Sequence, residues 1–272
     1  EPVTTNPCVI DHDSYECMEY AMEYCATHDD PACDDMGDDE DMFICGNGDE
    51  IPFEWVNDGG EDCEYGADEQ QYKFTNWNGA ELPVFYAKPS KVNSSSRLVV
   101  VMHGRKRNAE EYRDQWIEAA EDLNLLVVVP KYSDESFPQV WGFNYGNVKT
   151  EKLEAIPDEL HAFSAIEPLV DDALKRFKLK SDHWGIYGHG AGAHFVHRYV
   201  LHHPEAEHTL AIAANLGWYL SMTEQDWPFG LTNSGIESEQ LKKAFSKYFL
   251  LMLGRADTST KPNSPYVKEP GL

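Results

Sequence analysis

The chain has 272 residues, enough for one large domain or for one large and one small domain. Its formal net charge of −26 excludes a general nucleic-acid-binding protein and argues against binding to anionic membrane surfaces. No apolar run approaches the ~20 residues that a membrane-spanning helix needs.

Acidic residues and cysteines are concentrated in residues 1–70. This stretch contains 23 of the 48 acidic residues and none of the 22 basic ones. All six cysteines also fall in it, and an even number in a short acidic segment predicts a disulfide framework formed in an oxidising compartment. Because the chain opens on Glu1 rather than Met, we expect a mature form without its signal peptide, secreted or displayed at the cell surface.

Residues 1–42 are predicted to be a cysteine-rich, acidic helical segment without chemistry of its own. Asp13 and Ser14 are suited to cap a helix whose apolar side chains recur at three- and four-residue spacing until Pro31 interrupts it. Its four cysteines predict two disulfides, and the sequence leaves all three pairings open. These cysteines are Cys8, Cys17, Cys25 and Cys33.

Residues 43–70 contain a series of closely spaced features. They are a Phe-x-Cys start at Phe43, an Asn-Gly turn at Asn47, Ile-Pro-x-x-Trp from Ile51, Asp-Gly-x-x-Asp-Cys from Asp58 and a closing Asp-Glu. This pattern resembles the LDL-receptor class A module over nearly the full length of that module.

The resemblance implies one disulfide and a calcium site. Cys45 and Cys63 match two family cysteines that pair with each other, whereas Glu50 and Asn57 stand at family cysteine positions. The implied calcium ligands are four carboxylates and two backbone carbonyls, six hard oxygens that suit Ca²⁺ better than zinc or a redox metal. The carboxylates belong to Asp58, Asp62, Asp68 and Glu69, and the carbonyls to Trp55 and Gly60. Independently, so many carboxylates in a short loop repel one another unless a divalent cation neutralises them.

From residue 71 onward, predicted strands alternate with predicted helices. The strands are expected at 72–74, 82–86, 98–102, 125–129, 184–187, 210–214 and 249–253, and the helices at 109–122, 158–179 and 191–203. Such alternation predicts an α/β fold with a mostly parallel sheet and helices on both faces.

Three motifs of this part share the layout of one family. The strand at 184–187 enters the turn Gly188-His189-Gly190-Ala191-Gly192, which opens directly into a helix. His103-Gly104 directly follows a core strand, and Asp257 lies in a turn after the last predicted strand.

Residues 72–260 therefore resemble the α/β-hydrolase family, most closely its secreted esterase and polyester-depolymerase branch. In that family the Gly-x-x-x-Gly turn is the nucleophile elbow, which presents a catalytic Ser. The resemblance implies that His103-Gly104 forms the oxyanion loop and that Asp257 is the vestigial triad acid.

The sequence lacks two of the groups that acyl transfer by this family needs. Acyl transfer needs a Ser hydroxyl and a His that accepts its proton, but the nucleophile position holds Gly190 and no His follows Asp257. Loss of triad members typically lowers the rate ~10⁴- to 10⁶-fold. His194 and His197 are three residues apart on the helix after the turn, and together with His103 they could form a metal site. We favour the interpretation that these histidines have ordinary structural roles.

The strand predicted at 249–253 is expected to form an edge of the sheet. In the family, one more strand and a closing helix flank it, and we predict that domain 71–272 lacks both. Because soluble proteins avoid bare apolar edges, we expect a partner to cover this strand. The partner would be another chain, a further subunit or a C-terminal fragment of the same protein.

Three hypotheses follow for the function. The leading one is a secreted, calcium-binding protein whose hydrolase-like domain is catalytically inactive and serves binding, adhesion or extracellular assembly. The second is a carboxylic-ester hydrolase inactivated at Gly190 and seen without its C-terminal His segment. The third is an extracellular scaffold subunit that polymerises through its open sheet edge.

Overall fold

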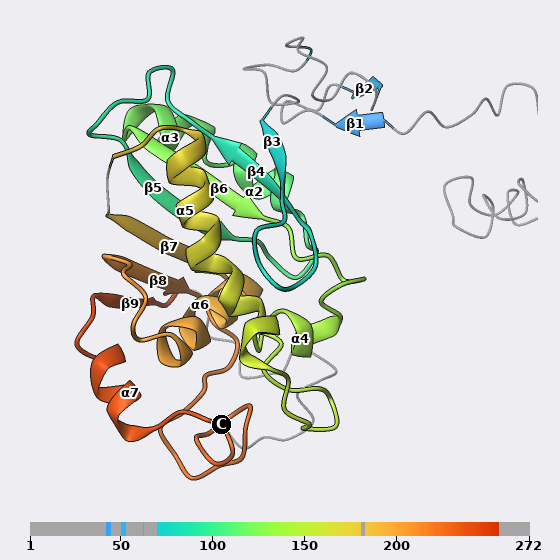
Figure 1. Ribbon diagram of the computed structural model, residues 1–272, viewed down its shortest axis with the longest axis vertical. Helices are drawn as coiled ribbons and strands as arrows, with labels where there is room; N and C mark the ends of the chain where they lie inside the picture. Colours follow the sequence, from blue (N-terminus) through green and yellow to red (C-terminus); the bar gives the residue numbers. More distant parts are fainter. Residues whose placement is uncertain (1–41, 45–49, 53–61, 63–69, 181–182, 256–272) are drawn as a thin grey trace, which may run out of the picture.

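The computed structural model describes residues 42–44, 50–52, 62, 70–180 and 183–255. Most of the strands in this part of the chain belong to one seven-stranded sheet (Figure 1). Its strands are β3 (Gln71–Phe74), β4 (Leu82–Ala87), β5 (Arg97–Met102), β6 (Leu125–Pro130), β7 (Trp184–His189), β8 (Leu210–Ala214) and β9 (Phe249–Met252).

The sheet has the strand order β3-β4-β6-β5-β7-β8-β9. β3 and β4 pair antiparallel, as do β4 and β6, and every later pair is parallel. The central strands β5 and β6 are almost continuously apolar and buried, as expected for strands that are covered on both faces. The prediction of a mostly parallel sheet is confirmed.

Helices cover both faces of the sheet. The short helices α2 (Ala109–Asp114) and α3 (Ile117–Asp122) pack on one face, where they form a small apolar cluster with alternate side chains of β5 and β6. The larger cluster on the other face includes side chains of α5 (Ile166–Arg176) and α6 (Ala191–His202). Figure 1 shows α5 crossing in front of the sheet.

Two predicted helices are wrong in extent. The helix expected at 109–122 is divided into α2 and α3, and the break places the Trp116 ring edge-on to the Tyr187 ring, with centroids 5.3 Å apart. The helix expected at 158–179 consists of two 3-10 turns, η4 (Asp158–Leu160) and η5 (Ala162–Ala165), followed by α5.

Pro168 and His161 explain the second difference. Pro168 has no amide hydrogen and is the third residue of α5, a position where the helix needs no donor. In the interior of a helix at 158–179, Pro168 would have broken it. His161, between the two 3-10 turns, has an extended backbone (φ −61°, ψ 137°).

Two further helices were not predicted. They are α4 (Gln139–Gly142), which follows β6, and α7 (Ser238–Ala244), which precedes β9. α7 begins with a capping box in which the Glu237 and Gln240 side chains each bond to the other residue's backbone.

β9 is an edge strand among the residues that the structure describes. Leu250, Leu251 and Met252 are each about half exposed, and Leu253 beyond them is 71% exposed. A groove of about 400 Å³ lies beside the strand, lined mainly by apolar side chains of α6, β9 and the segment 219–222. The partner expected to cover this edge remains a prediction.

The N-terminal part is described only in short pieces. β1 (Met42–Ile44) pairs antiparallel with β2 (Glu50–Pro52). All six cysteines and all the proposed calcium ligands except Asp62 lie outside the described residues, and Asp62 is exposed. The disulfides, the calcium site and the domain boundaries therefore remain predictions. Within the described part of the chain, no helix is both long enough and apolar enough to cross a membrane.

Candidate functional site

The turn between β7 and α6 has a backbone conformation that glycine adopts far more readily than other residues. Gly190 lies at φ 55° and ψ −114°, between the last residue of β7 and the first of α6. Its amide donates to the Ala214 carbonyl of the neighbouring strand at 3.0 Å. A Cβ built on Gly190 would meet no heavy atom within 4 Å, so a side chain here would project into open space.

The two glycines that flank this turn have the opposite surroundings. A Cβ on Gly188 would lie 2.2 Å from the carbonyl oxygen of Gly192, and one on Gly192 would lie 2.2 Å from the carbonyl oxygen of Met102. Both positions require glycine because the backbones of β7, α6 and β5 touch there. The same contact brings the end of β5 directly against the first turn of α6.

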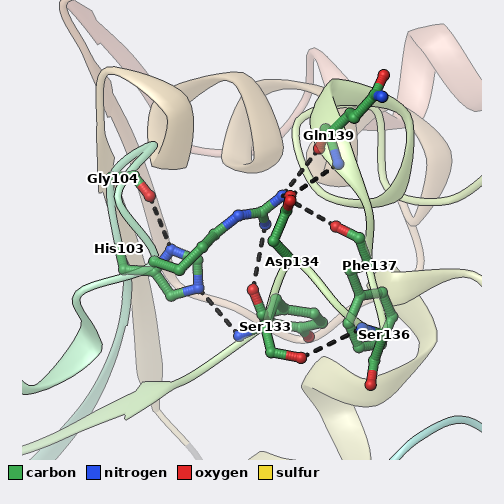
Figure 2. Close-up of polar contacts among 9 residues, drawn as sticks. His103, Gly104, Ser133, Asp134, Ser136, Phe137 and Gln139 are labelled. Carbon is green, nitrogen blue, oxygen red and sulfur yellow. Dashed lines mark hydrogen bonds and ion pairs between the residues drawn. The ribbon is translucent and has the colours of Figure 1, made fainter. Parts of the chain in front are cut away.

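The segment after β5 is organised by the buried side chain of His103. Its Nε2 accepts the Tyr132 amide at 3.0 Å, so the hydrogen of this neutral ring lies on Nδ1, which donates to the Gly104 carbonyl at 3.0 Å (Figure 2). Burial lowers the pKa of His103 to about 3. His103 is therefore a structural group and does not act as an acid or base near neutral pH.

This arrangement fixes the direction of the next amide. In a trans peptide unit the C=O and N–H bonds point in opposite directions, so the Arg105 amide points away from the His103 ring. Among the described residues, no backbone carbonyl accepts a hydrogen bond from Arg105. Ala191, the first residue of α6, likewise lies in a helical turn whose amides have no partner inside the helix. The amides of Arg105 and Ala191 thus have no backbone acceptor in the described part of the chain.

Arg107 fixes the remainder of the segment after β5. Its guanidinium donates to the carbonyls of Tyr132 (3.2 Å), Phe137 (2.9 Å) and Gln139 (2.8 Å) and forms an ion pair with Asp134 at 3.2 Å (Figure 2). Arg107 has a left-handed backbone conformation (φ 61°), which is unusual for a side chain of this size. Burial lowers the pKa of its guanidinium. The sequence around Arg107 carries no signal of this role, because the partners of its side chain are mostly backbone carbonyls of a distant segment.

The histidines of α6 hold the segment after β8. His194 Nε2 accepts the Gly217 amide at 3.1 Å, and His197 Nε2 accepts the Leu220 amide at 3.2 Å. Burial is the main cause that lowers the pKa of His194 well below its usual value and that of His197 to about 3. Within the part of the chain that the structure describes, no group of three or more His, Cys, Asp or Glu could hold a metal ion.

Aromatic rings lie beyond these histidines, of which Trp218 and Trp141 are partly exposed and Tyr145 is buried. The Trp218 ring packs against His194 with centroids 4.3 Å apart, and its Nε1 donates to the Tyr145 hydroxyl at 3.1 Å. Trp141 packs edge-on against Tyr145 at 5.2 Å. Arg198, fully buried below them, places its guanidinium 4.7 Å from the centre of the Tyr145 ring, and burial lowers its pKa to about 10. These rings form an apolar wall near the start of α6.

Many solved structures resemble this chain, and two of them are similar enough in both sequence and structure to compare. Poly(aspartic acid) hydrolase-1 from Sphingomonas sp. KT-1 is 36% identical, with a TM-score of 0.69 over 71% of this chain and 74% of the other. The chain belongs to the α/β-hydrolase family. The poly(3-hydroxybutyrate) depolymerase LpqC from Bordetella parapertussis is 29% identical, with a TM-score of 0.65 over 72% and 67% of the two chains. No protein-family model matches the sequence, and a comparison with curated proteins finds no match.

In α/β-hydrolases, the corner that Gly190 occupies has a known catalytic role. In α/β-hydrolases the residue at this strained corner carries the nucleophile, and the amide after it forms the oxyanion hole together with an amide from the loop after an earlier strand. In this chain the corner holds Gly190, Ala191 follows it as the first residue of α6, and Arg105 lies in the segment after β5. Asp257 lies outside the described residues, but the turn that leads to it begins at Gly254, which bonds to Asn215.

Proposed function

We propose that this chain has the substrate site of a carboxylic-ester hydrolase related to polymer-degrading enzymes, and that Gly190 leaves the site able to bind but not to cleave. The observation that carries the proposal is the elbow geometry of Gly190, which has open space above it and the first turn of α6 directly after it. Both relatives are named as polymer-cleaving enzymes. The comparisons therefore favour the hypothesis of an ester hydrolase inactivated at Gly190 over that of an adhesion or scaffold protein.

The backbone can still recognise a carbonyl group. Amides at an oxyanion position stabilise the negative charge that develops on a carbonyl oxygen, and they also donate to the carbonyl of a bound ester or amide. What glycine lacks is an atom that forms the acyl intermediate. A polymer segment would therefore rest on the partly exposed rings of Trp141 and Trp218 with one carbonyl at the elbow, and it would not be cleaved.

Binding is tested by titrating ¹⁵N-labelled protein with a short 3-hydroxybutyrate oligomer. We expect saturable shifts of the Arg105, Gly190 and Ala191 amide resonances. Shifts confined to other regions, or no shifts at millimolar oligomer, would overturn the binding part of the proposal.

Loss of cleavage is tested with a matched pair, Gly190→Ser and Gly190→Ala, on an activated short-chain ester. We expect no turnover by the wild type or by Gly190→Ala. Because residues 258–272 contain no His to accept the Ser proton, imidazole is added as an external base, and we then expect a covalent acyl adduct on Gly190→Ser, detected by mass spectrometry. Both substitutions add a Cβ, so only the hydroxyl distinguishes them. Turnover by the wild type above that of Gly190→Ala would show that the chain is an active enzyme.

We also propose that residues 43–69 bind Ca²⁺ through the ligands that the sequence implies. The support is the density of carboxylates in this short stretch, which has no basic residue to offset their repulsion. A bound calcium ion would stiffen this part of the chain, whose cysteines indicate an extracellular setting.

A further inference from the structure

Two adjacent cations lie in the segment after β5, whose start touches the first turn of α6. Arg105 and Lys106 are both exposed, and within the described residues neither forms an ion pair. The nearest acidic residue along the chain, Glu110, is already paired with Lys131 at 2.9 Å. The positive charge of Arg105 and Lys106 is therefore available to a ligand.

The backbone that carries these two cations is held on both sides. Before them, the Gly104 carbonyl accepts from both His103 Nδ1 and the Arg107 amide. After them, the Arg107 guanidinium is bound to three carbonyls of the segment 132–139. A ligand that meets Arg105 and Lys106 thus meets charges on a fixed turn, and ordering that turn adds no entropic cost to binding.

The position of this turn places the cations at the elbow. The carbonyl oxygens of Met102 and His103 would lie 2.2 and 2.9 Å from a Cβ on Gly192, so the start of the turn touches the first turn of α6. A ligand carbonyl held by the Arg105 amide would have the Arg105 guanidinium and the Lys106 ammonium within reach of its neighbouring groups.

We propose that Arg105 and Lys106 make this site selective for a polymer that carries carboxylates next to its ester or amide carbonyls. The inference rests on the proposed function, because it assumes that a polymer carbonyl binds at Gly190. An anionic polymer needs such local cations, because the chain as a whole carries 48 acidic and only 22 basic residues and would otherwise repel it. Arginine also binds a carboxylate through two parallel hydrogen bonds, which adds direction to the attraction.

The test compares two probes on the full chain, poly(aspartic acid) of defined length and an uncharged 3-hydroxybutyrate oligomer. The charge-reversed variant is Arg105→Glu/Lys106→Glu. The matched control, Lys88→Glu/Lys91→Glu, changes the charge equally at two exposed lysines between β4 and β5, at the opposite end of the sheet. We expect the ratio of anionic to neutral affinity to fall at least tenfold in the first variant and to stay within twofold in the control.

Salt gives a second readout. Affinity of the wild type for poly(aspartic acid) should weaken as salt rises from about 0.01 to 0.15 M, where the Debye length shortens from about 30 to 8 Å, and affinity for the neutral oligomer should not. An equal fall of the ratio in both variants would show general charge attraction and overturn the inference. Wild type that binds only the neutral oligomer would overturn the inference and leave the proposed function intact. Wild type that binds neither probe would overturn both.

Discussion

Asn215 and His189 are joined by a hydrogen bond of 3.1 Å between Nδ2 and Nε2, which links the end of β8 to the residue before Gly190. The same side chain holds the turn after β9, because its Oδ1 accepts the Gly254 amide at 2.6 Å. An amide N–H can only donate, so the Gly254 contact fixes which end of the Asn215 side chain is oxygen. Nδ2 must then donate to His189, whose Nε2 carries no hydrogen. The His189 hydrogen lies on Nδ1.

The substitution Asn215→Asp should move the hydrogen of the His189 ring from Nδ1 to Nε2. A carboxylate can only accept, so Nε2 of His189 must carry a hydrogen to keep the contact. The ¹⁵N chemical shifts of the His189 imidazole report which nitrogen is protonated, and we expect them to exchange between wild type and variant. Asn215→Ala serves as the control, since it releases the ring without imposing a partner. Wild type that already shows a protonated Nε2 would contradict the assignment.

Arg107 should stabilise the fold far more than its neighbour Arg105. Arg107→Lys keeps the charge, but one ammonium cannot replace the planar guanidinium that reaches three carbonyls and a carboxylate. We expect a loss of about 1–3 kcal/mol in the free energy of unfolding, measured by urea denaturation. Arg105→Lys, the same change on an exposed side chain two residues earlier, should alter it by less than about 0.5 kcal/mol. Equal effects would mean that the Arg107 contacts contribute no net stability.

The glycines of the elbow should respond oppositely to alanine. Gly188→Ala forces a Cβ to within 2.2 Å of a backbone oxygen, which a flexible side chain cannot relieve, and should lower the free energy of unfolding by more than about 3 kcal/mol. Gly190→Ala meets open space and bears only the strain of a positive φ, about 1–2 kcal/mol. Urea denaturation of the two variants separates these cases. A Gly190→Ala variant as unstable as Gly188→Ala would show that the space above the elbow is filled.

The sequence was sufficient to predict the sheet and the elbow because both leave local signals. Apolar runs such as 98–102 mark strands that are covered on both faces, and the paired glycines at 188 and 192 mark a place where backbones touch. Arg107 and Asn215 left no such signal. Their partners are backbone groups of distant segments, and a carbonyl or amide has the same chemistry at every position of a sequence.

The roles of His194 and His197 could not be predicted from the sequence for the same reason. Spacing along a helix placed His194 and His197 on neighbouring turns, which suited a metal site as well as a structural role. What distinguishes the two is the pair of amides, from Gly217 and Leu220, that the fold brings to their Nε2 atoms. The charged residues after β5, Arg105 and Lys106, were visible in the sequence. That no acidic side chain of the described residues pairs with them was not.

Buried histidines should make the fold sensitive to acid. Burial lowers the pKa of His103 and His197 to about 3 and that of His203 to about 4, whereas an unfolded chain protonates histidine near 6.5. The unfolded state therefore binds more protons at intermediate pH, so the stability contribution is complete above pH 6.5 and is lost as pH falls toward 4 and below. Each group adds a slope of up to about 1.4 kcal/mol per pH unit.

The slope is measured by urea denaturation at a series of pH values between 7 and 4. His197→Gln removes one titrating group and keeps an oxygen that can accept the Leu220 amide, so its slope should be smaller by the share of one histidine. Arg105→Lys, which neither adds nor removes a group that titrates between pH 4 and 7, provides the control and should leave the slope unchanged. Identical slopes for His197→Gln and the wild type would refute the contribution of that ring.

Calcium should bind to residues 43–69 with a defined stoichiometry and a dependence on particular carboxylates. Asp62→Asn removes one proposed ligand charge and should weaken calcium binding at least tenfold by isothermal titration calorimetry, because Ca²⁺ affinity follows the number of ligand charges. Asp39→Asn makes the same charge change in the acidic segment outside the proposed ligand set, and should weaken binding less than twofold. If both substitutions weaken binding equally, the ion is held by diffuse charge, and the resemblance of this stretch to a calcium module does not extend to its chemistry.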